Sequence, residues 1–322
     1  MAHPVPLARV VRSGVEESVH LGSVVVCDAD GRIVLAAGDP ERFLFTRSCT
    51  KPLQASVSLG AIEGDLPQDL LALACGSHNG EPEHVRGVRR MLRRGGLAAR
   101  DLGCPPDRPS RGADAAEVSR PSPVFHNCSG KHAAMLLACV GAGWDTAAYL
   151  APSHPLQRAI ARAVAAACDA EPTIGVDGCG APVHGVPLRG LATMYARLAT
   201  PARLGALASR AARATDAMRA HPFLVAGTGR SDTALMTAFP GIVTKVGAEG
   251  AHCAAIPALG LGVAVKVEDG ADRAAAPTLL RTLAALGVAD EDALPAVARR
   301  PVLGGGRQVG EVEAVVRLRR PR

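Results

Sequence analysis

The sequence predicts an α+β fold in which helices cover one mostly antiparallel sheet. Apolar or β-branched segments of strand length lie near both ends of the 322-residue chain, and the stretch between them shows helical periodicity. Strands from the two ends can share one sheet only if the helical middle is inserted between them. We therefore expect a single domain that spans residues 1–322.

The first expected element is an antiparallel hairpin. Its strands are Val24 to Cys27 and Ile33 to Ala37, and the intervening residues 28–31 have turn chemistry. The helical segments that follow begin at Pro or Ser, which favour helix starts. They cover residues 52–62, 82–94, 129–140, 155–169, 187–199 and 201–218.

Three consecutive strands are expected after the helices, because Gly and Pro separate short β-branched or apolar runs at 242–246, 251–256 and 261–267. A last strand at 312–318 could close the sheet beside the first hairpin. The proline-rich stretch 100–122 is expected to be a surface loop, and its role as a lid, a partner contact or a connector stays open.

The composition indicates a soluble protein with reduced thiols. No apolar stretch reaches the roughly 18 to 20 residues of a membrane helix, and the first ten residues lack the apolar run of a secretory signal. The nine cysteines are an odd number, which fits a cytoplasmic compartment better than a disulfide framework.

The net charge of +6 raises the alternative of a nucleic-acid binder, but the pattern of charges argues against it. The densest basic run alternates with apolar residues at helical spacing, which is typical of the solvated face of an amphipathic helix. Aromatic residues make up only 2% of the chain and offer few stacking platforms for bases. The run consists of Arg86, Arg89, Arg90, Arg93 and Arg94, and the basic C-terminal group, whose role stays open, consists of Arg317, Arg319, Arg320 and Arg322.

The first chemical motif is Ser48 followed by Lys51, a hydroxyl and an amine three residues apart. Side chains at this spacing are neighbours on a helical turn, so a neutral lysine could deprotonate the serine. Pro52 disfavours helical geometry at Lys51, and the pair could instead bridge a turn ahead of the helix. A capping serine followed by a surface lysine is the structural alternative.

Two further clusters combine thiols with other polar groups. Cys128, Lys131 and His132 are three or four residues apart and project from one face of an expected helix. Asp177 and Cys179 lie in a tight glycine-rich loop. Cys128 and Cys179 could supply two soft ligands to zinc, with Lys131 or His132 as the third and water as the fourth. Without a metal, the first cluster is a cap followed by a core helix.

Three other polar positions complete the set. Ser77 lies in a polar, glycine-broken loop ahead of a helix, which suits it to hold a small ligand. Lys245 ends a strand before a turn, and Lys266 alternates with valines on a following strand. From this alternation alone, Lys266 is expected to be exposed.

Together these motifs resemble those of the thermolabile, rhizobial-type L-asparaginases, the family called asparaginase II. They stand in that family's order and cover nearly the whole chain. The segments that carry the resemblance are 46–52 (TRSCTKP), 77–81 (SHNGE), 127–132 (NCSGKH), 177–182 (DGCGAP), 247–250 (GAEG) and the strand of Lys266.

This resemblance implies that the single domain is catalytic and hydrolyses the side-chain amide of L-asparagine. The implied fold is similar to serine β-lactamases and glutaminases, and the implied assembly is a homodimer. Two serine–lysine pairs are implied as catalytic groups, Ser48 with Lys51 and Ser77 with Lys266. In the implied mechanism Lys51 deprotonates Ser48, which attacks the amide carbon.

The resemblance also implies a zinc site and a substrate pocket. Zinc would be held by Cys128, Lys131 and Cys179, with water completing its coordination. Its role in catalysis or in substrate anchoring stays open, as does the selectivity for asparagine over glutamine. The residues matched to substrate-binding or pocket-lining positions are Arg47, His132, Asp177 and Cys253.

Two rival functions remain. A penicillin-recognising serine hydrolase would use the Ser48 motif together with Lys245-Val246-Gly247, and it would turn over nitrocefin. A zinc-stabilised binding module would use the cysteines structurally and would show no amidase activity.

Overall fold

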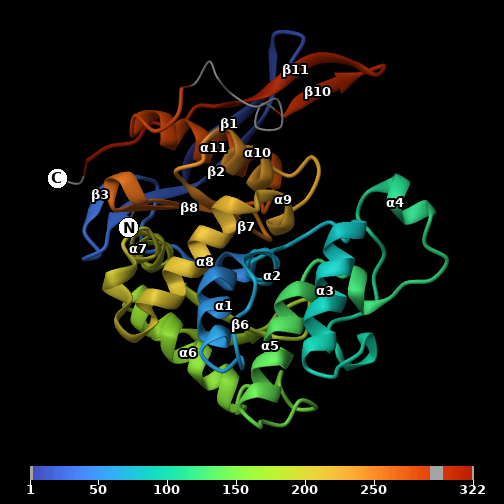
Figure 1. Ribbon diagram of the computed structural model, residues 1–322. Helices are drawn as coiled ribbons and strands as arrows, with labels where there is room; N and C mark the ends of the chain where they lie inside the picture. Colours follow the sequence, from blue (N-terminus) through green and yellow to red (C-terminus); the bar gives the residue numbers. More distant parts are fainter. Residues whose placement is uncertain (1–2, 291–299, 321–322) are drawn as a thin grey trace.

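The computed structural model describes residues 3–290 and 300–320. Strands from the two ends of the chain lie side by side in one antiparallel sheet, with the C-terminal pair next to the first N-terminal strand (Figure 1). From one edge to the other the strands are β10 (Pro301–Gly304), β11 (Arg307–Ala314), β1 (Val5–Arg12), β2 (Val15–Asp28), β9 (Leu261–Val267), β8 (Ala251–Ile256) and β7 (Val243–Gly247), and β3 (Ile33–Ala37) pairs with β2.

Helices cover both faces of this sheet. One face packs against α7, and Gly262 on β9 makes this close approach possible, because a Cβ there would lie 2.1 Å from Ala192 O and from Ala196 N. The opposite face packs against α11, which contacts β1, β8, β9 and β11. The helices are α1 (Lys51–Leu59), α2 (Gln68–Ala74), α3 (Pro82–Arg94), α4 (Gly112–Ala116), α5 (Ser129–Gly141), α6 (Pro155–Cys168), α7 (Leu188–Ala199), α8 (Ala208–Ala220), α9 (Pro222–Val225), α10 (Ser231–Ala238) and α11 (Asp272–Ala285).

A second, three-stranded antiparallel sheet connects the large sheet to the helical region. It consists of β4 (Phe43–Phe45), β6 (Pro182–Pro187) and β5 (Thr173–Val176). Because β4 leads directly into the Ser48 segment and β5 and β6 flank the loop of Cys179, this small sheet brings the two motifs together.

The predicted α+β class is confirmed, with the helical middle inserted between the terminal strands. The hairpin corresponds to β2 and β3, and the three consecutive strands to β7, β8 and β9. Two predictions were wrong in detail. The expected strand at 312–318 is β11, which begins earlier and pairs with β1 rather than with the hairpin. The helix expected over 201–218 is interrupted, because Gly205 has a φ of 54° and separates a 3₁₀ turn from α8.

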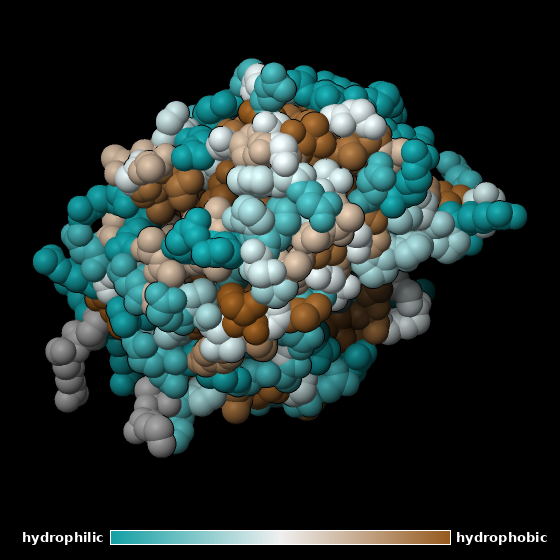
Figure 2. Space-filling model, turned by 90° about the horizontal axis from the view of Figure 1, so that it is seen from below, coloured by the Kyte–Doolittle hydropathy of each residue, from teal (hydrophilic) through white to brown (hydrophobic). Residues whose placement is uncertain are grey.

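The basic run lies on α3 as predicted. Its arginines are exposed, and Val85, Val88, Met91 and Leu92 are buried on the other side. Seen from below, the surface mixes hydrophobic and hydrophilic residues in small groups (Figure 2). Within the described residues, no helix has both the length and the apolar character needed to cross a membrane.

Candidate active site

The Ser48 motif lies on a 3₁₀ turn, η1 (Arg47–Thr50), that runs directly into α1. Arg47 starts the turn with a φ of 47°, in the left-handed region. Lys51 is helical, with φ −57° and ψ −38°, even though Pro52 follows it. The Ser48 side chain is partly exposed, whereas Lys51 is 1% exposed. The surface-lysine alternative is therefore excluded.

The Lys51 amine is hydrogen-bonded to Ser77 rather than to Ser48. Its Nζ donates to Ser77 Oγ at 2.8 Å and to Gly76 O at 2.6 Å. Among the described residues, the backbone N–H of Lys51 donates to Ser48 O, but no side-chain hydrogen bond joins the two residues, so their direct side-chain pairing stays a prediction. The amine extends from the helix start to the end of α2, where the chain turns at Gly76.

The environment of Lys51 favours the neutral amine. Burial lowers the pKa of Lys51, and the nearby cations Lys131 and Lys245 lower it further, although Cys128 opposes them. A neutral lysine in contact with a hydroxyl can accept a proton from it. This is the arrangement that a serine–lysine mechanism needs.

Lys266 forms its hydrogen bonds with partners other than Ser77. It is 8% exposed, which corrects the expectation of an exposed lysine. Its Nζ donates to Glu249 O at 2.7 Å and to Val267 O, because β9 places it beside the turn that joins β7 to β8. In the part of the chain that the structure describes, Lys266 and Ser77 share no hydrogen bond and each is bonded to another partner, so their pairing as catalytic groups stays a prediction.

Lys245 is a further buried lysine, and the sequence did not reveal its surroundings. It is fully buried on β7, and its Nζ donates to Asp232 Oδ2 at 3.1 Å. Thr244 and His252 donate to the other oxygen of Asp232, each at 3.1 Å. Burial alone would raise the pKa of Asp232, but Lys245 and His252 hold it below its ordinary value. Cys49 donates to the Lys245 carbonyl at 3.5 Å, which ties this network to η1.

The structure brings the three predicted zinc ligands together. Lys131 Nζ donates to Cys179 Sγ at 3.1 Å, and Cys128 Sγ donates to Asn127 Oδ1 at 2.9 Å. The neighbouring Cys179 thiol lowers the pKa of Cys128 strongly, and the positive charges of Lys51 and Lys131 add to the effect. Burial lowers the pKa of Lys131, but the neighbouring Cys128 and Cys179 raise it, and the net shift is upward.

This donor set fits zinc. A tetrahedral zinc with typical bond lengths separates a nitrogen and a sulfur ligand by about 3.5 Å, so the 3.1 Å contact would need to open only slightly. The described residues contain no group of three His, Cys, Asp or Glu that could hold a metal, so a metal bound here would depend on Lys131 as its third ligand.

The four predicted substrate-binding residues divide into two pairs. Arg47 Nε donates to Asp177 Oδ1 at 2.7 Å, which ties η1 to the glycine-rich loop at the protein surface. His132 and Cys253 are fully buried. His132 Nδ1 lies 2.6 Å from the Tyr149 hydroxyl, whereas its Nε2 is buried and has no hydrogen-bond partner among the residues that the structure describes. On β8, burial raises the pKa of the Cys253 thiol, and the neighbouring Cys49 raises it further.

Comparison with known proteins decides the family. The sequence model of L-asparaginase II matches residues 8–314, which is nearly the whole chain. The chain belongs to the L-asparaginase II family. As a member of that family it is an amidohydrolase, in agreement with the resemblance of its motifs. Among curated proteins, no sequence matches it significantly.

Solved structures give more distant similarities. The chain is similar to Mglu in its tris and glutamate form, with 14% identity and a TM-score of 0.47 over 84% of this chain, and it spans 60% of the length of that protein. It is also similar to a β-lactamase from Mycobacterium bovis (14% identity, TM-score 0.44, 83% and 95% of the two chains). A third match is the Bacillus subtilis glutaminase YbgJ (13% identity, TM-score 0.39, 83% and 88%).

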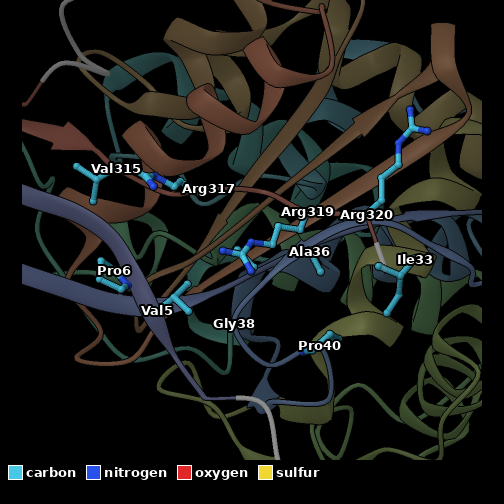
Figure 3. Close-up of a pocket in the computed structure, with 11 residues that line it drawn as sticks. Val5, Pro6, Ile33, Ala36, Gly38, Pro40, Val315, Arg317, Arg319 and Arg320 are labelled. Atoms are coloured by element: carbon cyan, nitrogen blue, oxygen red, sulfur yellow. The ribbon is translucent and has the colours of Figure 1, made fainter. Parts of the chain in front are cut away.

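Two cavities bear on where ligands could bind this L-asparaginase II family member. One, of about 480 Å³, adjoins the site, because Arg47 and Gly178 form part of its wall. The other, of about 650 Å³, lies between β1, β3 and the C-terminal segment, where Arg319 points across the opening toward Val5 and Pro6 (Figure 3). None of the predicted site residues lines this second cavity.

Proposed function

We propose that this protein is an L-asparaginase that hydrolyses the side-chain amide of L-asparagine to L-aspartate and ammonia. The observation that carries the proposal is the buried contact between Lys51 and Ser77, one turn from the partly exposed Ser48. It supplies a base and two hydroxyls in a chain that belongs to a family of amidohydrolases.

We infer different roles for the two serines from their different exposure. Ser48 is partly exposed, so a substrate can reach its hydroxyl, whereas Ser77 is 6% exposed and is held by Lys51. Ser48 is therefore the proposed nucleophile, as the motif resemblance implies. Lys51 accepts its proton, and Ser77, in contact with the same amine, relays a proton to the departing group.

The reaction divides into two acyl transfers. Ser48 Oγ bonds to the amide carbon, the carbon–nitrogen bond breaks, and the proton taken by Lys51 leaves with ammonia. Water then attacks the ester carbon, its proton passes through Lys51 to Ser48 Oγ, and the bond between Ser48 and the acyl group breaks to release aspartate. Backbone N–H groups near the start of α1 are suited to stabilise the negative charge that develops on the carbonyl oxygen.

Cys128, Lys131 and Cys179 are the proposed zinc ligands. When bound, zinc would supply positive charge that anchors the α-amino or α-carboxylate end of the substrate. The ion pair of Arg47 with Asp177 holds η1 against the loop of Cys179, so it fixes Ser48 relative to these ligands. His132 and Cys253 are proposed as support for the pocket, because both are buried behind it.

Trapping the acyl-enzyme tests the assignment. With asparagine and rapid acid quenching, mass spectrometry should find the aspartyl adduct on the wild-type protein and none on Ser48→Ala. Ser77→Ala should still form the adduct, but much more slowly. Adduct formation on Ser48→Ala, or unchanged ammonia release by it, would remove Ser48 from the chemistry.

One observation favours a second function. The fully buried Lys245 stands on β7 beside η1, as the motif of a penicillin-recognising serine hydrolase requires. Nitrocefin turnover without asparagine turnover would establish this alternative. The cytoplasmic location and the homodimer stay predictions, and gel filtration with light scattering tests the second.

A further inference from the structure

The cavity beside the site has an unusual wall for an enzyme that acts on a small polar amino acid. Phe43 and Phe45 on β4 and Val176 on β5 line it and are 42%, 41% and 80% exposed. The chain has five phenylalanines, and two of them line this cavity. Contiguous exposed apolar surface is a feature of ligand-binding grooves.

Two glycines allow the phenylalanine rings of this wall to pack against the backbone. A Cβ at Gly185 would lie 2.2 Å from Cζ of Phe43, and one at Gly175 would lie 3.1 Å from Cε1 of Phe45. The rings therefore lie directly on the backbone of β6 and β5, and the two rings pack edge to face at 5.6 Å. The apolar surface is preformed, which lowers the entropic cost of binding.

A cation without a carboxylate partner stands at the edge of the same cavity. Lys266 lines the cavity and donates to the carbonyls of Glu249 and Val267. Among the described residues it forms no ion pair, unlike Arg42 and Arg47, which line the cavity too and are paired with Glu268 and Asp177. Lys266 is thus available for a carboxylate brought by a ligand.

The cavity begins one residue away from the proposed chemistry. Arg47 and Gly178, which form part of its wall, directly precede Ser48 and Cys179. Adjacent Cα atoms are about 3.8 Å apart, so Ser48 and Cys179 lie next to residues of this wall. At about 480 Å³ the cavity also falls within the usual size range of small-molecule sites.

We infer that this cavity is a second subsite, which binds an apolar residue joined to the α-carboxyl group of asparagine. The apolar side chain contacts Phe43 and Phe45, and the terminal carboxylate binds Lys266. The substrate class thereby extends to asparaginyl dipeptides with an apolar second residue. The reaction is unchanged, because the side-chain amide loses ammonia to water and the peptide bond stays intact. This inference rests on the proposed function.

The test compares L-asparaginyl-L-leucine with L-asparaginyl-glycine and with free asparagine, by ammonia release and chromatography of the products. The expected preference for the leucine dipeptide in kcat/KM is about tenfold, the factor that corresponds to removing much of a leucine side chain from water. Phe43→Ala should lose most of this preference and keep free asparagine hydrolysis within about twofold. Val15→Ala, at an exposed valine outside the cavity, is the matched control and should change neither.

A second pair of substrates tests Lys266. Wild-type enzyme should favour the leucine dipeptide over its C-terminal amide, and Lys266→Met should abolish that difference. If asparagine is hydrolysed but the leucine and glycine dipeptides react equally or not at all, the subsite is refuted and the proposed function stands. If Phe43→Ala instead reduces the molecular mass in solution, the wall is a contact between subunits, which also overturns the subsite. Failure to hydrolyse asparagine overturns both.

Discussion

Removing the charge of Asp232 should destabilise the protein far more than its small change in shape suggests. The carboxylate accepts four hydrogen bonds, from Thr244, Lys245, Val246 and His252. It is 1% exposed, and Lys245 is fully buried. Asp232→Asn keeps the size of the side chain. Its NH₂ group, however, replaces an oxygen that accepted two hydrogen bonds, so donors would face donors.

The expected loss is about 3 to 5 kcal/mol of unfolding free energy, the cost of leaving one member of a buried ion pair uncompensated. Urea titrations at neutral pH, followed by circular dichroism, measure it. The matched control is Glu313→Gln, which breaks a half-exposed pair with Arg9 at 2.8 Å and should cost about 1 kcal/mol or less.

Two further results test the reasoning. The double variant Asp232→Asn with Lys245→Met removes the stranded ammonium and should recover most of the loss. Because the folded-state pKa of Asp232 is lowered, its stabilisation is complete above the unfolded pKa of about 3.9 and is lost as the pH falls below it. A loss under about 1 kcal/mol at neutral pH, or no recovery in the double variant, would refute the assignment of Asp232 as the counter-ion of a charged Lys245.

Three other outcomes are expected. Gly262→Ala should lower the free energy of unfolding by about 3 kcal/mol or more, because the new Cβ would meet the backbone of α7 at 2.1 Å, and urea titration measures this. The asparaginase rate should fall as the pH drops through the lowered pKa of Lys51, since its neutral form is the base; a rate that does not depend on pH there would exclude this role. Because the pKa of Lys51 is lower in the folded state, the free energy of unfolding should also increase as the pH rises from that folded-state pKa toward the unfolded value of about 10.4. Equilibrium dialysis should find one zinc per chain, and Cys179→Ala should abolish zinc binding. The control Cys75→Ala, at a thiol whose pKa is raised by burial to about 12, should leave zinc binding unchanged.

Much of the fold could be predicted because local signals and burial agree. Strands β8 and β9 and helix α3 have the predicted bounds, since Gly and Pro punctuate them on both sides. The first strand, β1, was missed. Its alternation is short and includes a proline, and the signal that could have revealed it is the Ser13-Gly14 turn, where both residues have positive φ.

Sequence spacing indicated which residues of one cluster lie together, but not which side chains make contact across elements. The spacing of Cys128 and Lys131 on one helix face is local, and the structure brings both to Cys179. The contact of Lys51 with Ser77 instead depends on where α1 and α2 cross, which no local pattern encodes. Asp232 escaped notice for the same reason, since its partners on β7 and β8 are set by the packing of α10.

The proposed role of Lys51 as the base agrees with the charge compensation of the other lysines buried at this site. Lys131 contacts the sulfur of Cys179 and lies near Cys128, and Lys245 is paired with Asp232. Lys51 contacts only a hydroxyl and a carbonyl, with no ion pair among the described residues. A second and third cation nearby make its own protonation still more costly. Burial and these two neighbouring cations therefore lower the pKa of Lys51. Lys245→Met, which removes one of the neighbouring charges, should raise the pKa of Lys51 and shift the pH–rate profile to higher pH.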